Sequence, residues 1–165
     1  WGPGALPLNT FSQNGPMGRC VADVALMLDA TAKHHPLDPL SYPAPSVPYA
    51  RSAASPVAPK TVAWAGDFGG ACTYDAEVEA ICRAATERFK EIGATVMEKA
   101  PDPEGARDAF QIFRGHHMAA GNGKLLQTHR ELLKPEVIWN IEYGLSLTSE
   151  DLRRGLILQA GVQQR

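Results

Sequence analysis

Histidine has the widest chemical range of the side chains in this sequence, because imidazole binds metal ions and moves protons near neutral pH. His116, His117 and His129 fall within one short stretch. A zinc-binding helix places two histidines four residues apart, as in H-E-x-x-H. His116 and His117 are adjacent instead, so on a helix they point about 100° apart and share an ion poorly. We therefore expect no metal site and interpret these histidines as surface or pocket-lining residues.

The stretch GDFGG lies between an expected strand and an expected helix, where phosphate-binding loops occur. It lacks both the G-x-G-x-x-G spacing and the G-K-[ST] sequence that cradle phosphates. Asp67 within it would also repel a phosphate. We expect no nucleotide site here and no other cofactor in the chain.

Nucleophiles of recognisable type are missing from the printed sequence. No serine lies in G-x-S-x-G or S-x-x-K. Cys20 precedes a helix, where a thiolate is stabilised, but no histidine is paired with it by the sequence, so a small structural residue is the better interpretation. Arg153 and Arg154 could bind a carboxylate or be solvated on a polar helix face. The residues alone therefore indicate no catalytic centre.

Composition excludes several classes of protein. The 165 residues are 44% hydrophobic and 21% charged, which is typical of a folded domain. A net charge of −2 gives no general basis for binding nucleic acid or an anionic membrane, and no apolar run approaches the roughly 20 residues of a membrane-spanning helix. Three cysteines without a C-x-x-C pair favour a reducing, cytoplasmic location over a disulfide framework.

Proline, glycine and apolar periodicity divide the chain into four parts, which we interpret together as one partial domain over residues 1–165 and as a piece of a longer chain. Residues 1–35 are a loop followed by a helix from Arg19 to Lys33. Residues 36–59 are a proline-rich connector, expected to be extended or a semi-rigid linker. Residues 60–100 form a β-α-β unit, and residues 101–165 are helical.

The β-α-β unit has the clearest local signals. KTVAWAG reads as a buried strand and ATVMEK as the second strand. Asp75 can cap a helix over residues 76–92, and Gly93 can end it in the C′ position. We expect one apolar face on this helix, formed by Val78, Ile81, Cys82, Ala85, Phe89 and Ile92.

The C-terminal part is expected to hold four helices. The first two span residues 104–120 and 124–134, separated by a turn at Gly121-Asn122-Gly123. A short helix follows over residues 136–143 and ends before Gly144. Thr148 is a suitable N-cap for the last helix, whose first turn is acidic.

Three stretches resemble the amidase signature family. FSQNGPMGRCVADVALMLDATAKHHPLDPLS resembles the segment that follows that family's catalytic core, where a Gly-Pro-Met/Ile-x-Arg turn leads into a helix of the form V-x-D-A-A-L-M-L. VAWAGDFGG is similar to the strand and turn after the family's connector. IEYGLSLTSEDLRRGL is similar to a later helix start. The resemblance covers most of the chain, and the three segments occur in the family's order.

This resemblance implies a mixed α/β fold, with a β-sheet flanked by helices, and hydrolysis of carboxamides to carboxylate and ammonia or amine. The family uses a serine nucleophile, a bridging serine with a cis peptide bond and a lysine base, with the serines in a G-G-S-S-G-G-S-type motif. That motif is absent from the printed sequence and is expected N-terminal to Trp1. We therefore assign no catalytic residue to this chain and expect it to be inactive alone.

The resemblance also suggests roles for particular residues. The helical part corresponds to the family's variable substrate region, so we select Phe113, His116, His117, Trp139 and Arg154 as substrate-pocket candidates. Gly15, Pro16, Met17 and Arg19 are expected to give structural support: the first two turn the chain, Met17 packs beneath the turn and Arg19 starts the helix. A Gly15→Val substitution is then expected to destabilise the fold before it alters catalysis.

Expected partners are a small amide substrate, the rest of the protein's own chain and, possible for a piece with uncovered surface, a second copy of itself. Two other functions stay open. The A-type chain of an amidotransferase would release ammonia from glutamine for a partner chain. It would need a glutamine-binding arginine, for which Arg153 or Arg154 is available, and an aspartate that we do not identify. A non-catalytic scaffold would have kept the fold and lost the serines.

Overall fold

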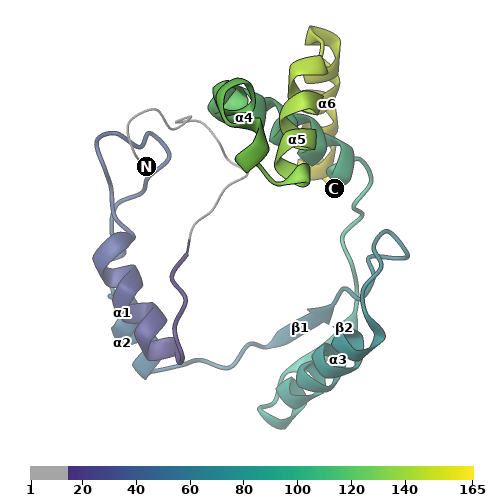
Figure 1. The fold of residues 1–165 in the computed structure, drawn as a ribbon. Helices are drawn as coiled ribbons and strands as arrows, with labels where there is room; N and C mark the ends of the chain where they lie inside the picture. Colours follow the sequence, from purple (N-terminus) through teal and green to yellow (C-terminus); the bar gives the residue numbers. More distant parts are fainter. Residues whose placement is uncertain (1–14) are drawn as a thin grey trace. The chain divides into compact units, whose positions relative to one another are not determined.

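A short parallel sheet covered by one helix is the part of the fold that the sequence predicted most closely. The computed structural model describes residues 15–165. β1 (Thr61–Trp64) pairs in parallel with β2 (Thr95–Glu98), and α3 (Ala76–Glu91) connects them and lies against both strands (Figure 1). The register places Thr61 opposite Thr95 and Trp64 opposite Glu98. This confirms the α/β fold class.

Both ends of α3 follow from local sequence. The Asp75 carboxylate accepts a hydrogen bond from the Glu77 amide at 2.8 Å, which satisfies one of the free N–H groups of the first turn. Gly93 adopts φ +88° just after the helix, a conformation that favours glycine. Acidic residues in the first turn and Arg88 and Lys90 in the last turn complement the helix dipole.

The proline-rich connector is not extended throughout, as we had expected. It contains α2 (Tyr49–Ala54), which packs on α1 (Val21–Thr31). Asp29 of α1 explains this helix, because its two carboxylate oxygens accept from the amides of Tyr49 and Ala50 at 2.6 and 3.0 Å. The N-cap of α2 therefore comes from a residue about 20 positions earlier, which local pattern could not reveal. The predicted start of α1 at Arg19 was also two residues early.

The expected turn at Gly121-Asn122-Gly123 is wrong, because α4 (Ala106–Thr128) continues through it. Neither glycine has a positive φ, and glycine weakens a helix without preventing it. A short 3₁₀ turn η1 (Arg130–Leu132) and α5 (Pro135–Ser146) follow, so α5 includes Gly144 rather than ending before it. α6 (Ser149–Gln164) begins as predicted: the Thr148 hydroxyl accepts from the Asp151 amide, and Asp151 Oδ2 accepts from the Thr148 amide.

The described part of the chain divides into two units. The first contains residues up to Pro56 together with Phe110–Arg153. The second contains Val57–Ala109 and Arg154–Arg165. In the second unit, Arg154 and Arg165 form ion pairs with Asp108 at 3.7 Å and with Asp102 at 3.2 Å.

α4 and α5 approach closely in the first unit. Gly115 is buried, and a Cβ added to it would lie 2.6 Å from a ring carbon of Tyr143. A Cβ added to Gly144 would overlap the carbonyl of Gly115 and lie 2.8 Å from the Cβ of Ala119. Two glycines therefore permit contact between the helix backbones, beside Ile112 and Ile141, which are almost fully buried.

A buried amide fixes the same helix pair. Asn140 is 6% exposed. Its side-chain oxygen accepts from Gln111 Nε2 at 3.4 Å and from Arg114 Nε at 3.2 Å, and its nitrogen donates to the Glu136 carbonyl at 2.7 Å. Both ends of the amide are satisfied, as burial of a polar group requires.

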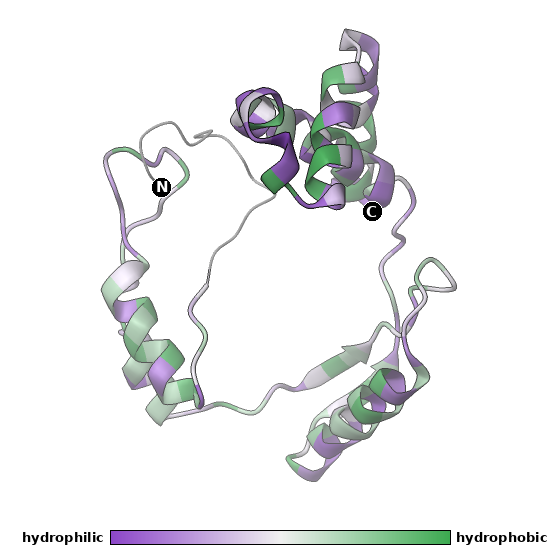
Figure 2. Cartoon of the chain, viewed as in Figure 1, coloured by the Kyte–Doolittle hydropathy of each residue, from purple (hydrophilic) through white to green (hydrophobic). Residues whose placement is uncertain are grey.

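The expected apolar face of α3 is present in sequence but is not covered by the described residues. Val78, Ile81 and Ile92 are each more than half exposed, and no residue of α3 is buried. α1 likewise carries apolar residues on several turns (Figure 2), of which only Ala25 is buried. Within residues 15–165, no helix is long and apolar enough to cross a membrane.

The glycine contact between α4 and α5 predicts the effect of one methyl group. Gly144→Ala should lower the free energy of unfolding by about 1–3 kcal/mol, because the added Cβ has no space without separating the helices. Urea denaturation followed by circular dichroism would measure this.

Gly121→Ala is the matched control, since it lies in α4 with nothing within 4 Å of the added Cβ. It should be neutral or stabilise the chain by about 0.5–1 kcal/mol through helix propensity. A Gly144→Ala protein as stable as Gly121→Ala would show that the helices do not meet at these glycines.

Candidate functional site

A cavity of about 550 Å³ lies in the second unit, at the carboxyl ends of β1 and β2. Its size is that of a small-molecule pocket, and open α/β sheets bind ligands at this end of their strands. The last residue of β1, Trp64, and the last residue of β2, Glu98, both line it. The loop between β1 and α3 and the first turns of α3 supply the rest of the wall.

Arg83 of α3 connects the elements around this cavity. Its Nη1 donates to Glu98 of β2 at 2.7 Å, and its Nη2 donates to Glu79 one turn earlier on α3 at 3.3 Å. The guanidinium carbon lies 5.5 Å from the centre of the Trp64 ring, within the range of a cation–π contact. The hydrogen bonds to Glu98 and Glu79 raise the pKa of Arg83, so this side chain stays charged.

The loop from β1 to α3 is tightly coiled. Gly66, Gly69 and Gly70 have positive φ values, and Phe68 adopts φ +56°, which is uncommon for a residue with a side chain. Two backbone hydrogen bonds hold the coil, from the Phe68 amide to the Ala65 carbonyl and from the Cys72 amide to the Asp67 carbonyl. Backbone strain of this kind persists where the surrounding structure fixes it, and it is common at ligand sites.

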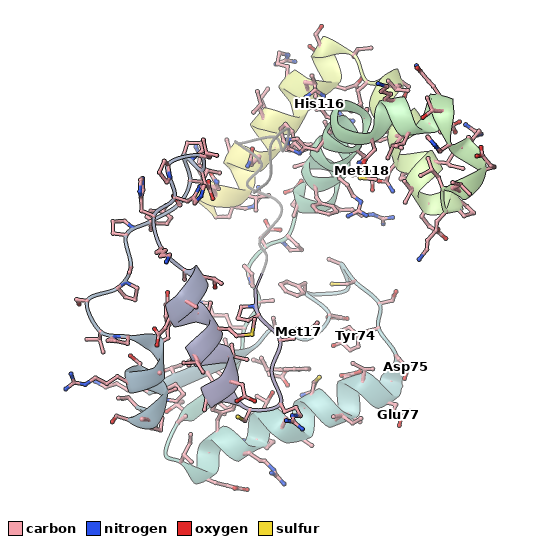
Figure 3. The ribbon with its side chains drawn as sticks, turned by 60° about the vertical axis from the view of Figure 1, so that its left-hand side comes forward. Met17, Tyr74, Asp75, Glu77, His116 and Met118 are labelled. Atoms are coloured by element: carbon pink, nitrogen blue, oxygen red, sulfur yellow. The ribbon has the colours of Figure 1, made fainter. Side chains whose placement is uncertain are left out.

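Trp64 and Tyr74 place two polar atoms near Gly66. A Cβ added to Gly66 would lie 3.5 Å from Trp64 Nε1 and 3.7 Å from the Tyr74 hydroxyl. Trp64 Nε1 is buried and has no hydrogen-bond partner among the described residues. Desolvation, with the charges of Glu79 and Asp67, raises the pKa of Tyr74, so its hydroxyl stays protonated. Figure 3 shows Tyr74 just before α3, with Asp75 and Glu77 at the start of the helix.

This site was not predicted from the sequence. We considered GDFGG only as a phosphate loop and treated Glu79 and Arg83 as an ordinary i,i+4 pair. The signal that could have found the site was the expected parallel pairing of the two strands, since that pairing brings Trp64 and Glu98 together.

The substrate-pocket candidates occupy α4, α5 and α6. His116 and His117 have ring centres 5.8 Å apart, and His116 is the more exposed of the two (Figure 3). Trp139, 53% exposed, stacks on Tyr143 with ring centres 5.5 Å apart and planes 3° from parallel. Phe113 is half-buried on α4. Arg154 belongs to the second unit and pairs with Asp108, so it does not join the other four, whose role in substrate binding stays a prediction.

The expected support residues precede α1. Met17 is 94% exposed, so the described residues do not provide the packing that we expected beneath the turn. A Cβ added to Gly15 would meet nothing within 4 Å, so these residues also give no steric reason for destabilisation by Gly15→Val. Arg19 lies in the bend before α1 rather than in the helix. The supporting role of Gly15, Pro16, Met17 and Arg19 stays a prediction for the longer protein.

Ionisable side chains that could bind metal are dispersed. From residue 15 onward, no three histidine, cysteine or acidic side chains gather as metal ligands would. Cys20, Cys72 and Cys82 are free and exposed. Arg153 bonds the Glu150 carboxylate at 2.7 Å, so this arginine already has an intramolecular partner.

His117 makes the stability of α4 depend on pH. Burial, together with the nearby His116, lowers the pKa of His117. Because the folded state favours the neutral imidazole, its stabilising effect is present above the unfolded pKa of about 6.5 and is lost as the pH falls through that value. The melting temperature of the chain should therefore fall between about pH 7.5 and pH 5.5.

His117→Gln should make this fall smaller, because the side chain no longer takes up a proton. His116→Gln removes only the neighbouring charge, so it should have a weaker effect in the same direction. Melting followed by circular dichroism at the two pH values measures both. An unchanged pH dependence in His117→Gln would contradict the assignment.

Comparison with known proteins covers most of the chain. The family model described as Amidase matches residues 7–150. The chain is 37% identical over 91 residues to an acylamidase of Rhodococcus erythropolis, a match that covers 55% of this chain and 19% of that protein. It is 38% identical over 106 residues to the A-type chain of the glutamyl-tRNA(Gln) amidotransferase of Moorella thermoacetica, covering 63% of this chain and 21% of that protein.

The fold has solved relatives as well. The structure of 6-aminohexanoate cyclic dimer hydrolase aligns with 88% of this chain and 32% of its own, with a TM-score of 0.65 and 19% identity. At this identity the likeness concerns the fold alone. The chain spans about a fifth of the length of the two relatives matched by sequence. Because the family model matches well over half of the sequence, this chain belongs to the amidase family.

Proposed function

We propose that this chain is a segment of an amidase that hydrolyses a carboxamide to a carboxylate and ammonia or an amine. The observation that carries the proposal is the family match over residues 7–150. The similarity to an acylamidase points to the same reaction class. No metal or nucleotide is needed for this reaction when a serine is the nucleophile.

The nucleophile of this proposal lies outside the chain. The printed sequence has no G-G-S-S-G-G-S-type motif, and the chain corresponds to about a fifth of its relatives' length. The exposed apolar residues of α3 provide a surface for further parts of the same protein. We propose that those parts are its main partner, with association of two copies as the alternative, and that the protein works in the cytoplasm.

The coding sequence upstream of Trp1 gives the first test. A G-G-S-S-G-G-S-like motif there, with a lysine further upstream, would support the amidase. The longer protein should then release ammonia or amine from simple amides, whereas the 165-residue chain should not. An upstream region without these residues would favour a scaffold, and turnover by the short chain would contradict the location of the nucleophile.

The A-type chain of an amidotransferase is the second candidate, favoured by the similarity to the Moorella thermoacetica protein. That protein's name concerns glutamyl-tRNA(Gln), so the corresponding function here would be release of ammonia from glutamine for a partner chain. Glutamine hydrolysis that requires a co-purified partner would favour this candidate. Hydrolysis of simple amides by one chain would favour the amidase.

Residues of α4 and α5 should set the choice of amide in the longer protein. Phe113→Ala and Trp139→Ala each remove an aromatic surface, so the ratio of kcat/KM between a bulky and a small amide should change by roughly tenfold, the value of one or two apolar contacts. Kinetics on a panel of aliphatic and aryl amides measures the ratio.

Leu125→Ala provides the control on α4, since Leu125 is an exposed apolar residue outside the candidate group. It should leave the ratio unchanged. Equal ratios in all three variants and the unaltered enzyme would remove α4 and α5 from the substrate pocket.

A further inference from the structure

We propose that the cavity at the carboxyl ends of β1 and β2 binds a neutral ligand through a primary carboxamide group, held between the Trp64 indole N–H and the carboxylates of Glu79 and Glu98. This site lies wholly within the second unit. The proposal does not depend on hydrolytic activity, because it concerns binding by residues that the chain itself contains. The volume of about 550 Å³ is ample for a small ligand.

The indole N–H of Trp64 defines what the ligand must offer. Trp64 Nε1 is buried, with no hydrogen-bond partner among residues 15–165, whereas buried indole N–H groups usually have one. Its surroundings place the Tyr74 hydroxyl nearby, beside Gly66. A ligand that fills this position therefore needs a hydrogen-bond acceptor, such as a carbonyl oxygen.

Two carboxylates define the opposite requirement. Glu79 and Glu98 line the cavity, and the hydrogen bonds of Arg83 engage only Oε1 of each. The second oxygen of each carboxylate remains an acceptor. A ligand beside them therefore gains from N–H donors, and a primary carboxamide carries an acceptor and two donors on one planar group.

Charge excludes the two ionic alternatives. An anion would lie beside Asp67, Glu79 and Glu98, while both terminal nitrogens of Arg83 already bond the two glutamates. A cation would lie beside Arg83 and Lys99, which line the same cavity, and would leave the indole N–H without an acceptor. A neutral group with both donors and an acceptor meets neither penalty.

The groups that would hold the ligand are positioned before it binds. Arg83 lies over the Trp64 ring and bonds to both glutamates, so neither the indole nor the carboxylates must be ordered by the ligand. The coiled loop with Phe68 at φ +56° adds a fixed wall beside them. Groups fixed in this way lose less conformational entropy on binding.

Three probes with the same ring separate the chemistries: benzamide is neutral, benzoate is an anion and benzylamine is a cation at pH 7. The experiment is a titration of the ¹⁵N-labelled 165-residue chain followed by NMR. The chain contains three tryptophans, and Trp64→Phe identifies the indole signal of Trp64. Benzamide should shift that signal to saturation, while benzoate and benzylamine should leave it in place.

Variants test which atoms take part. Trp64→Phe keeps an aromatic ring but removes the N–H, so shifts of neighbouring amide signals should report benzamide binding about tenfold weaker, the loss of one hydrogen bond. Glu79→Leu should also weaken binding. Glu87→Leu is the matched control, because Glu87 lies on the same helix but outside the cavity, and it should bind as the unaltered chain does.

Several results would overturn the proposal. They are the absence of a benzamide shift at the Trp64 signal, an equal shift with benzoate, or equal weakening by Glu79→Leu and Glu87→Leu. If Trp64→Phe disturbs the whole spectrum, the two glutamate variants alone decide. Since the short chain is expected to be inactive, failure here leaves the amidase proposal standing, and failure of the amidase assay leaves this binding result standing.

Discussion

Parallel pairing of β1 with β2 is the constraint on which the second unit depends. The register that places Trp64 opposite Glu98 ends both strands at the same level. α3 returns across the pair, so Arg83 can contact the indole of one strand and the carboxylate of the other. A slip by one residue would turn every side chain of one strand to the opposite face and would separate these three groups. The cavity is therefore a consequence of strand register.

Arg83 contributes more through position than through charge. Its ion pairs with Glu79 and Glu98 involve side chains that are about half exposed or more, and such pairs contribute at most about 1 kcal/mol each. Their geometric effect is larger, because three elements are linked by one guanidinium. The same division applies to Asn140, whose amide aligns α4 and α5 while the buried Ile112 and Ile141 supply the apolar contact.

Elements with local signals could be predicted from the sequence, and elements with distant causes could not. α3 was predicted within one residue because Asp75 and Gly93 act on adjacent backbone. α2 was missed because its N-terminal amides bond to Asp29 of α1. The helical path of α4 through Gly121 and Gly123 opposed local preference. The cavity was missed for the same reason as α2, since Trp64, Arg83 and Glu98 are spread along the chain and meet only through register.

Glycine serves opposite ends in the two units, which explains why its occurrence alone was a poor guide. Gly66, Gly69 and Gly70 supply the positive φ values of a coiled loop, which is the use that we had assumed for glycine from the sequence. Gly115 and Gly144 remain helical and supply space for a neighbouring backbone. The two uses look alike in a sequence. They are distinguished only by what a Cβ would meet, which depends on the helix that packs against it.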